Sequence, residues 1–349
     1  MELRSIEGVD FSHQMVLVRV DFNIEQTNTV AVEENFRLDI VKKTIDTIAS
    51  FDGAKIALLT HFGRPEGKRD TAFSVQKLVS AVGRSLGKEI IFVPDCIGDE
   101  VKIAIANLAN DQVLLLENVR FYPGEETNDE EFARSLAKPF TIFVNEAFSV
   151  CHRAHASVEA ITRLLPSYGG LRLLKEVREL ERVALSPEHP AIAIIGGAKI
   201  ETKLPLIQAL EKNYDAVLVG GKIANEALDQ KLVFSDKVLL PKDFDSAARL
   251  DIGPQTIGYF TQIINTAKTV VWNGPMGKFE EKPYDIGTDA ILHAILECQA
   301  YVVIGGGESL AVLEQAGVIN KVSFVSSGGG AMLEFLSGDA LPGLVALKA

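Results

Sequence analysis

The chain has 349 residues, of which 47% are hydrophobic and 23% are charged, a composition typical of globular domains rather than disordered segments. Its 35 basic residues are outnumbered by 47 acidic ones, so the formal net charge is −12, which disfavours nucleic acid and anionic membranes as partners. The length exceeds what one hydrophobic core usually serves, so we expect two domains. No apolar run reaches membrane-spanning length and the first residues lack a signal core, which predicts a cytoplasmic protein.

The first half of the chain contains four apolar runs of strand character, each ending in polar or basic residues. These runs are residues 16–23, 56–65, 113–121 and 142–148. They lack strict alternation, which is typical of strands buried on both faces of a parallel sheet. Amphipathic segments of helical length lie between the runs, at residues 38–51, 74–86, 99–108 and 129–136. This order predicts an α/β domain with a parallel sheet.

Cationic side chains follow the ends of these predicted strands. They are Arg37, His61, Arg64, Arg120, His152, Arg153 and His155. Ligands of open α/β sheets bind beyond the carboxyl ends of the strands, so we expect these groups to converge on a small polyanion. Asp21 and Asn23 end the first strand, where they either accept hydrogen bonds from ligand hydroxyls or only form the turn.

The second half repeats the same kind of pattern without a residue-level repeat. Its predicted strands are residues 191–199, 216–221, 237–241, 269–275, 301–307 and 322–330, and all but the third run into glycine. Between the two halves, residues 169–186 show helical spacing of apolar residues. This segment is either an ordinary surface helix or a helix that joins the domains. The three cysteines, Cys96, Cys151 and Cys298, are scattered, which predicts neither a disulfide framework nor a zinc site.

Three of the glycine-rich strand ends offer candidate phosphate sites. In the motif GGAKIETK, Lys199 and Lys203 are four residues apart, which places both on one helix face next to a glycine turn. The motif suits a polyphosphate, or it is a strand–helix turn with two solvated lysines. In GGGES, Glu308 either holds Mg²⁺ or only complements the helix dipole. The third, SSGGGAMLEF, is a further glycine-rich segment at the start of a predicted helix. The loop WNGPMGKFE either binds ligand or only forms a tight turn.

Several well-known motifs are missing from the sequence. It contains no Walker A sequence and no GxGxxG fingerprint, and it lacks both HExxH and GxSxG. These absences weigh against a P-loop NTPase, a typical dinucleotide dehydrogenase, a zinc protease and a serine hydrolase.

Taken in order, the motifs RVDFN, THFGRP, ENVRF, HRAHAS, GGAK, WNGPMG and GGGES resemble those of phosphoglycerate kinases, over most of the chain. The resemblance implies two Rossmann-like parallel-sheet domains joined by a helix, with a hinged cleft. It implies an acid-substrate domain at residues 1–168, an interdomain helix at 169–186 and a nucleotide domain at 187–335. The tail, residues 336–349, would return to the first domain.

The resemblance also implies an activity and its residues. A monomeric glycolytic kinase would transfer a phosphoryl group reversibly between 1,3-bisphosphoglycerate and Mg-ADP, giving 3-phosphoglycerate and Mg-ATP. The phosphoglycerate positions would be Asp21, Asn23, Arg37, His61, Arg64, Arg120 and Arg153. The nucleotide positions would be Gly196, Gly197, Lys199, Lys203, Gly220, Asn273, Pro275, Glu280, Gly306, Gly307, Glu308 and Ser309. Arg37, Lys203, Gly306 and Gly329 would act on the transferring group, with Glu308 as the Mg²⁺ ligand.

Three departures from the family pattern all fall in the predicted nucleotide domain. Glu308-Ser309 replaces Asp-Thr, Lys222 replaces the third glycine of a run, and the interval 225–251 is much shorter than expected. These departures predict weaker or altered nucleotide binding. They also leave open a pseudoenzyme that binds phosphoglycerate, while the complete Arg/His set disfavours a kinase for a related carboxylic acid.

Overall fold

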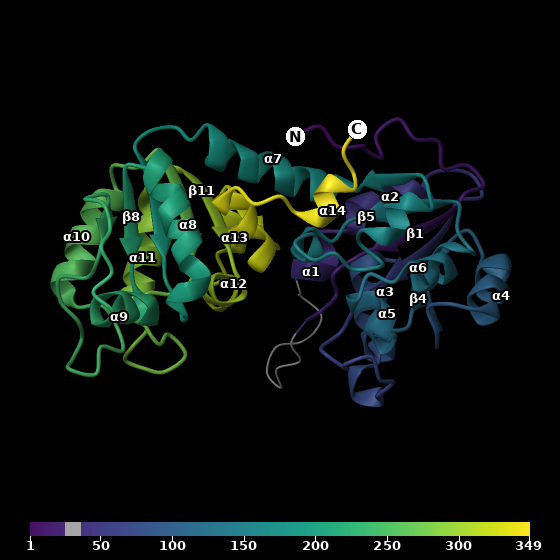
Figure 1. Ribbon diagram of the computed structural model, residues 1–349, viewed down its shortest axis with the longest axis horizontal. Coiled ribbons are helices and arrows are strands. Elements are labelled where there is room, and N and C mark those ends of the chain that lie inside the picture. The colour runs from purple at the N-terminus through teal and green to yellow at the C-terminus, as the bar shows by residue number, and fades with distance from the viewer. Residues whose placement is uncertain (25–35) are drawn as a thin grey trace. The chain divides into compact units, whose positions relative to one another are not determined.

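The computed structural model describes residues 1–24 and 36–349 and contains two six-stranded parallel sheets. Each sheet belongs to its own compact unit: Met1–Lys175 with Ala340–Ala349 form the first, and Glu176–Asp339 form the second. The predicted α/β class is therefore confirmed (Figure 1). Among the described residues, none of the helices combines the length and apolar composition that crossing a bilayer needs.

The sheet of the first unit has the strand order β3-β4-β2-β1-β5-β6. The strands are β1 (Met15–Arg19), β2 (Lys55–Leu59), β3 (Glu89–Val93), β4 (Gln112–Leu116), β5 (Ile142–Asn145) and β6 (Ser167–Gly169). The helices are α1 (Phe36–Asp39), α2 (Lys42–Ala49), α3 (Val79–Leu86), α4 (Asp99–Asn107), α5 (Pro123–Glu126), α6 (Glu130–Ala137) and α14 (Pro342–Val345). The four predicted strands are all present, each shorter than its apolar run, so Asp21 and Asn23 lie in the loop after β1.

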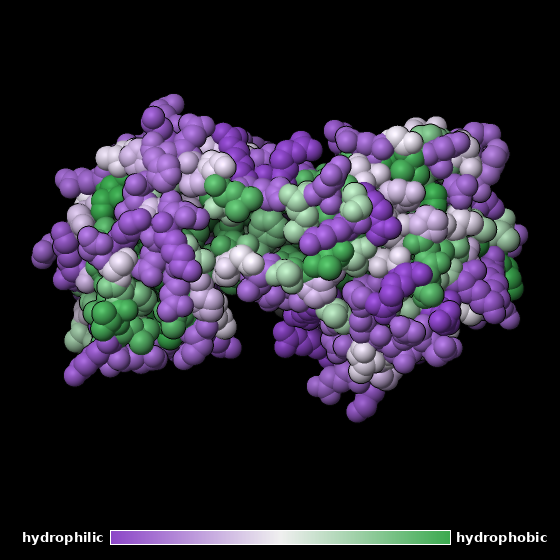
Figure 2. Space-filling view, turned by 45° about the horizontal axis from the view of Figure 1, so that its top comes forward, coloured by the Kyte–Doolittle hydropathy of each residue, from purple (hydrophilic) through white to green (hydrophobic). Residues whose placement is uncertain are grey.

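Both faces of this sheet are buried, as the apolar runs predict. Val16 and Val18 of β1 belong to one hydrophobic cluster, and Leu17 between them belongs to another. Successive side chains of a strand point to opposite faces, so the two clusters cover the two sides of the sheet. Figure 2 shows hydrophilic residues over much of the visible face of each unit, interrupted by hydrophobic patches.

The sheet of the second unit has the strand order β12-β11-β10-β7-β8-β9. The strands are β7 (Ala191–Ile195), β8 (Ala216–Val219), β9 (Val238–Leu239), β10 (Thr269–Asn273), β11 (Tyr301–Gly305) and β12 (Phe324–Ser326). The helices are α8 (Ile200–Asn213), α9 (Gly221–Asp229), α10 (Pro254–Ile264), α11 (Ile286–Glu297), α12 (Gly307–Gln315) and α13 (Gly330–Ser337). All six predicted strands are present, and β9 is only two residues long.

A single helix, α7 (Leu171–Leu185), contains the boundary between the two units. Its first turn is capped by Glu146, whose carboxylate accepts hydrogen bonds from the backbone N–H groups of Arg172 and Leu173, each at 3.0 Å. Burial raises the pKa of Glu146 to about 7. After the second unit, the chain returns to the first, where Leu3 and Lys348 form an antiparallel bridge.

Candidate functional site

In the first unit, the loop after β1 places the carboxylate of Asp21 among cations. Arg37 forms an ion pair with Asp21, Ser149 donates a hydrogen bond to it, and His61 Nδ1 lies 3.8 Å from its Oδ1. Burial acts to raise the pKa of Asp21, yet Arg37 and His61 hold it well below its usual range. Asn23 closes the same loop, because its side-chain oxygen accepts a hydrogen bond from the N–H of Gly63 at 2.8 Å.

Arg120 and Arg153 lie close enough to His61 that their charges add to the effect of burial in lowering its pKa, whereas Arg64 is solvent-exposed. Arg120 is buried, donates to the carbonyl of Gly63 at 2.8 Å and is 3.2 Å from Glu126. Burial, reinforced by the charges of Arg19 and Arg153, lowers the pKa of Arg120 to about 10. Arg64 is exposed, and within the described ranges its side chain has no hydrogen bond or ion pair.

The two histidines of the HRAHAS motif have different environments. Arg153 Nε contacts His152 Nε2 at 3.1 Å, and burial together with Arg153 lowers the pKa of His152 to about 4. His155 is turned toward the interior, where its Nδ1 is 3.7 Å from the buried Glu125. His155 therefore faces an internal network, and its convergence with the other cations on a ligand stays a prediction.

The centre of that internal network is Arg19, which was not among the predicted site residues. Its guanidinium is fully buried, donates to Ser157 Oγ at 2.9 Å and lies 3.3 Å from His61 Nδ1. Burial lowers the pKa of Arg19, whereas the charges of Glu125 and Asp21 oppose this. Ser157 in turn donates to Glu125 through its N–H at 2.9 Å and its hydroxyl at 2.6 Å. From the protein interior, Arg19 thus contacts His61 and interacts with the charge of Asp21.

In the second unit, the loops after β7, β8, β10 and β11 pack together through glycines. A Cβ atom on Gly196 would lie 2.0 Å from the carbonyl oxygen of Pro275, and one on Gly220 would lie 2.5 Å from Met276 Sδ. A Cβ on Gly306, which has a φ of +101°, would lie 2.9 Å from Asn273 Nδ2. The loops form a cradle of backbone groups with no room for side chains, and we call it the glycine cradle.

Lys203 of α8 is held at the glycine cradle. Its ammonium donates a hydrogen bond to Asn273 Oδ1, and Asn273 Nδ2 donates to the carbonyl of Gly305 at 2.7 Å. Burial lowers the pKa of Lys203 to about 8, and the charge of Glu308 opposes this shift. Glu308 lies against Gly197, where desolvation raises its pKa, and the charge of Glu280 contributes to the increase. Lys203 and Glu308 therefore lie close to Asn273, and Glu280 is near enough to Glu308 to influence its pKa.

Other predicted nucleotide positions lie on the same loops with different degrees of exposure. Lys199 is exposed, has a φ of +68° and precedes α8. Gly307 begins α12, and Gly329, with a φ of +48°, precedes α13. Ser309 is fully buried and its hydroxyl accepts a hydrogen bond from the N–H of Gly274 at 2.7 Å. The Ser309 hydroxyl therefore already has a hydrogen-bond partner inside the protein.

One of the first-turn backbone N–H groups of α8 already has a side-chain partner. The N–H of Ile200 donates to Glu226 Oε2 of α9 at 2.7 Å. Glu226 was not among the predicted site residues. Only the packing of α9 beside α8 brings its carboxylate to this position.

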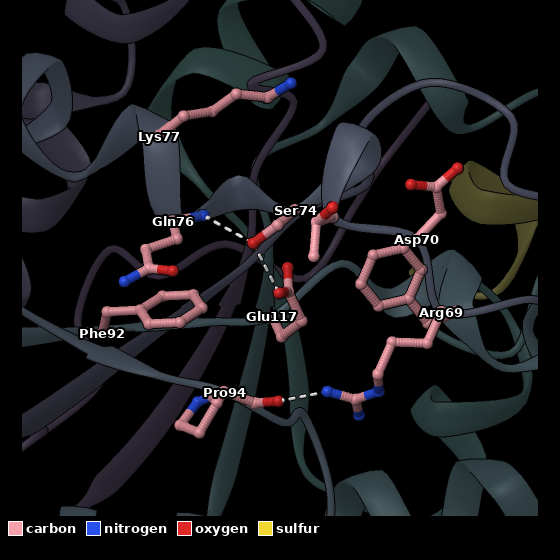
Figure 3. A pocket seen from close by; sticks show the side chains of 10 residues that line it. Arg69, Asp70, Ser74, Gln76, Lys77, Phe92, Pro94 and Glu117 are labelled. Atoms are coloured by element: carbon pink, nitrogen blue, oxygen red, sulfur yellow. Dashed lines mark hydrogen bonds between the residues drawn. The ribbon is translucent and has the colours of Figure 1, made fainter.

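A separate cavity of about 410 Å³ lies at the edge of the first sheet, beyond the ends of β3 and β4 (Figure 3). Phe92 and Pro94 form an apolar side, and Glu117 lies between the strands and the helical turns. Glu117 accepts hydrogen bonds from Ser74 Oγ at 2.6 Å and from backbone N–H groups, and Arg69 donates to the carbonyl of Pro94 at 2.6 Å. None of the predicted site residues is among those that line this cavity, so it is not part of the candidate site.

Comparisons with known proteins agree with the motif order. The sequence profile of the phosphoglycerate kinase family matches residues 6–250 and 236–339. A phosphoglycerate kinase of Rhodospirillum centenum is 39% identical over 398 aligned residues, covering 100% of both chains. One of Bartonella quintana is 38% identical over 397, again with 100% coverage of both.

Solved structures give the same match. The crystal structure of phosphoglycerate kinase from Pyrococcus horikoshii has a TM-score of 0.88 at 28% identity, covering 99% of this chain and 98% of that one. The enzyme from Coxiella burnetii has a TM-score of 0.82 at the same identity and coverage. The Bartonella alignment has 397 positions, 48 more than this chain has residues, so relatives carry segments that it lacks. The two profile matches overlap at residues 236–250, within the interval 225–251 that is shorter than the family pattern.

Proposed function

We infer that this chain, which belongs to the phosphoglycerate kinase family, catalyses reversible phosphoryl transfer between 1,3-bisphosphoglycerate and ADP, yielding 3-phosphoglycerate and ATP. The observation that carries this inference is the match to phosphoglycerate kinases over the full chain. The same match favours an active phosphotransferase over a pseudoenzyme. A monomeric state, a cytoplasmic location and the hinge between the units stay predictions from the sequence.

We assign phosphoglycerate binding to the cationic group of the first unit. Arg37, Arg120 and Arg153 supply positive charge for the phosphate and carboxylate of the acid, as does the exposed Arg64. Asp21 and Asn23 supply acceptors for its hydroxyl group. The buried Arg19 keeps His61 and Asp21 in place from the protein interior.

We assign the nucleotide phosphates to the glycine cradle of the second unit. Lys203 and Lys199 supply cations, and the helix entries at Gly306–Gly307 and Gly329 add backbone N–H donors. Gly196, Gly197, Gly220 and Pro275 give the cradle its shape. In the direction of ATP synthesis, a terminal β-phosphate oxygen of ADP bonds to the phosphorus, and the bond from phosphorus to the acyl oxygen breaks. A carboxylate leaves, so the step needs charge neutralisation rather than proton transfer.

The carboxylates at the cradle fit a magnesium ion when the nucleotide phosphates complete its shell. Within residues 1–24 and 36–349, no three His, Cys, Asp or Glu side chains are grouped to hold a metal. Glu308 stands at the cradle, with Glu280 near enough to influence its pKa. Mg²⁺ typically takes one or two carboxylates plus substrate phosphates, so we propose Glu308 as its protein ligand. Bound there, the ion neutralises phosphate charge.

The pH dependence of catalysis is expected to follow Lys203. A lysine is cationic below its pKa, which burial lowers to about 8 here. The kcat/KM for nucleotide, which reports on the free enzyme, should therefore fall as the pH rises through about 8. The Lys203→Arg variant keeps its charge over this range and should lose this fall. A wild-type profile that stays flat through this pH range would contradict the assignment.

The activity itself is tested by ATP formation from 1,3-bisphosphoglycerate and Mg-ADP, followed with a coupled enzyme assay. We expect turnover that depends on both substrates. Calorimetric binding of 3-phosphoglycerate without any turnover would instead support the pseudoenzyme.

A further inference from the structure

Glu226 lies at the helix terminus that Lys199 and Lys203 flank. Its Oε2 accepts a hydrogen bond from the N–H of Ile200, the first residue of α8, at 2.7 Å. The residue before Ile200, Lys199, provides no side-chain cap. A carboxylate from α9 therefore caps α8, and the first-turn N–H groups of a helix are also the groups that bind anions.

Close packing between the N-terminal ends of α8 and α9 fixes the position of Glu226. Gly221, at the start of α9, would place a Cβ atom 2.8 Å from the N atom of Gly197. The N–H of Ile223 donates to the carbonyl of Gly197 at 3.1 Å. Because α9 begins directly on the glycine cradle, Glu226 brings its negative charge to the same loop that would hold the nucleotide phosphates.

Lys222 lies one helical turn before Glu226 and carries the opposite charge. Its ammonium is 3.7 Å from Glu226 Oε1, and 69% of its side chain is exposed, against 23% for Glu226. An exposed i,i+4 pair of this kind is weak and salt-sensitive. Lys222 therefore offsets the negative charge of Glu226 only in part.

We propose that Glu226 is an affinity-determining residue of the nucleotide site, whose carboxylate competes with nucleotide phosphate for the N-terminus of α8. The proposal rests on the proposed function, since it requires the second unit to bind nucleotide. Electrostatic repulsion between Glu226 and the nucleotide grows with the negative charge of the nucleotide. A bound Mg²⁺ ion neutralises two of the negative charges of ADP. Glu226 therefore discriminates against metal-free ADP more strongly than against Mg-ADP, while Lys222 moderates both effects.

The test is calorimetric titration of the full chain with ADP, once with EDTA and once with Mg²⁺. Glu226→Gln keeps a carbonyl acceptor for Ile200 and removes the charge. We expect binding of metal-free ADP to tighten roughly fivefold to tenfold and that of Mg-ADP roughly twofold to threefold. Lys222→Ala should weaken binding, and less so when Glu226→Gln is also present.

Glu211→Gln is the matched control, because Glu211 is on α8 but bonds to Ser235 at 2.9 Å, far along the helix from Ile200. It should leave ADP affinity unchanged. Unchanged or weaker ADP binding by Glu226→Gln overturns the proposal, as does a chain that binds no ADP. If Glu226→Gln unfolds, Glu226→Ala takes its place in the same titrations, with the same expected order of effects. Absence of ATP-forming turnover refutes the proposed function separately, because the affinity ratios do not depend on turnover.

Discussion

The Lys203→Ala variant is expected to lose about 10²–10³-fold in kcat, because one preorganised charge that stabilises a transition state is worth this much. Lys203 is held by Asn273 and lies close to the Glu308 carboxylate. Its ammonium is therefore positioned before the substrates arrive, so no reorganisation is needed during transfer. The loss should appear in kcat of the coupled ATP-forming assay, whereas calorimetric binding of 3-phosphoglycerate to the first unit should not change.

Lys212→Ala is the matched control for this prediction. Lys212 is exposed in the last turn of the same helix, about 13 Å along the axis from Lys203. Removing it changes the net charge equally and should leave kcat unaltered. Full activity of Lys203→Ala would reject the assigned role of this lysine, even if the chain is an active kinase.

The Arg19→Met variant is expected to destabilise the first unit by on the order of 3–5 kcal/mol. Arg19 is fully buried and compensates the charge of Glu125, which is also fully buried. Burial acts to raise the pKa of Glu125, and His155 and Arg19 hold it below its usual value. Removing one partner of a buried ionic network leaves the other charge uncompensated. Hydrogen exchange of β1 and β5 amides under increasing denaturant measures the effect.

Arg163→Met serves as the comparison for Arg19→Met. Arg163 is also in the first unit, but its partners Glu130 and Glu159 form ion pairs with it at the surface. Such exposed pairs contribute within about 1 kcal/mol, so the variant should unfold nearly as the wild type does. Equal effects of the two substitutions would show that burial of the Arg19 charge does not increase its contribution to the free energy of unfolding.

The fold could be predicted where strands are long and buried on both faces. β1 and β4 have continuous apolar runs, and the glycines after β7 and β11 mark where helices begin. β3 and β6 were missed for physical reasons. Most of the residues of β3 are only partly buried at the sheet edge, and β6 has only three residues.

The site could be predicted where a strand end presents a polar residue directly. Asp21 and Asn273 are examples, since each lies at or just beyond the last residue of a strand. Arg19 was missed because charged residues inside buried strands are rare, and its partner Glu125 is more than a hundred residues away. The internal role of Ser309 and the cap by Glu226 depend on how loops and helices pack, which spacing along one segment does not reveal.

The return of residues 340–349 to the first unit has a consequence for how the protein is made. Leu344 and Leu347 are fully buried there, and the N–H of Gly343 donates to the carbonyl of Cys151 at 2.9 Å. A ribosome must synthesise all of the second unit before it reaches these residues, so the second unit has its complete sequence before the first does. During translation, the apolar surface at Cys151 and Val158 that Gly343 covers therefore stays exposed until the last residues are made.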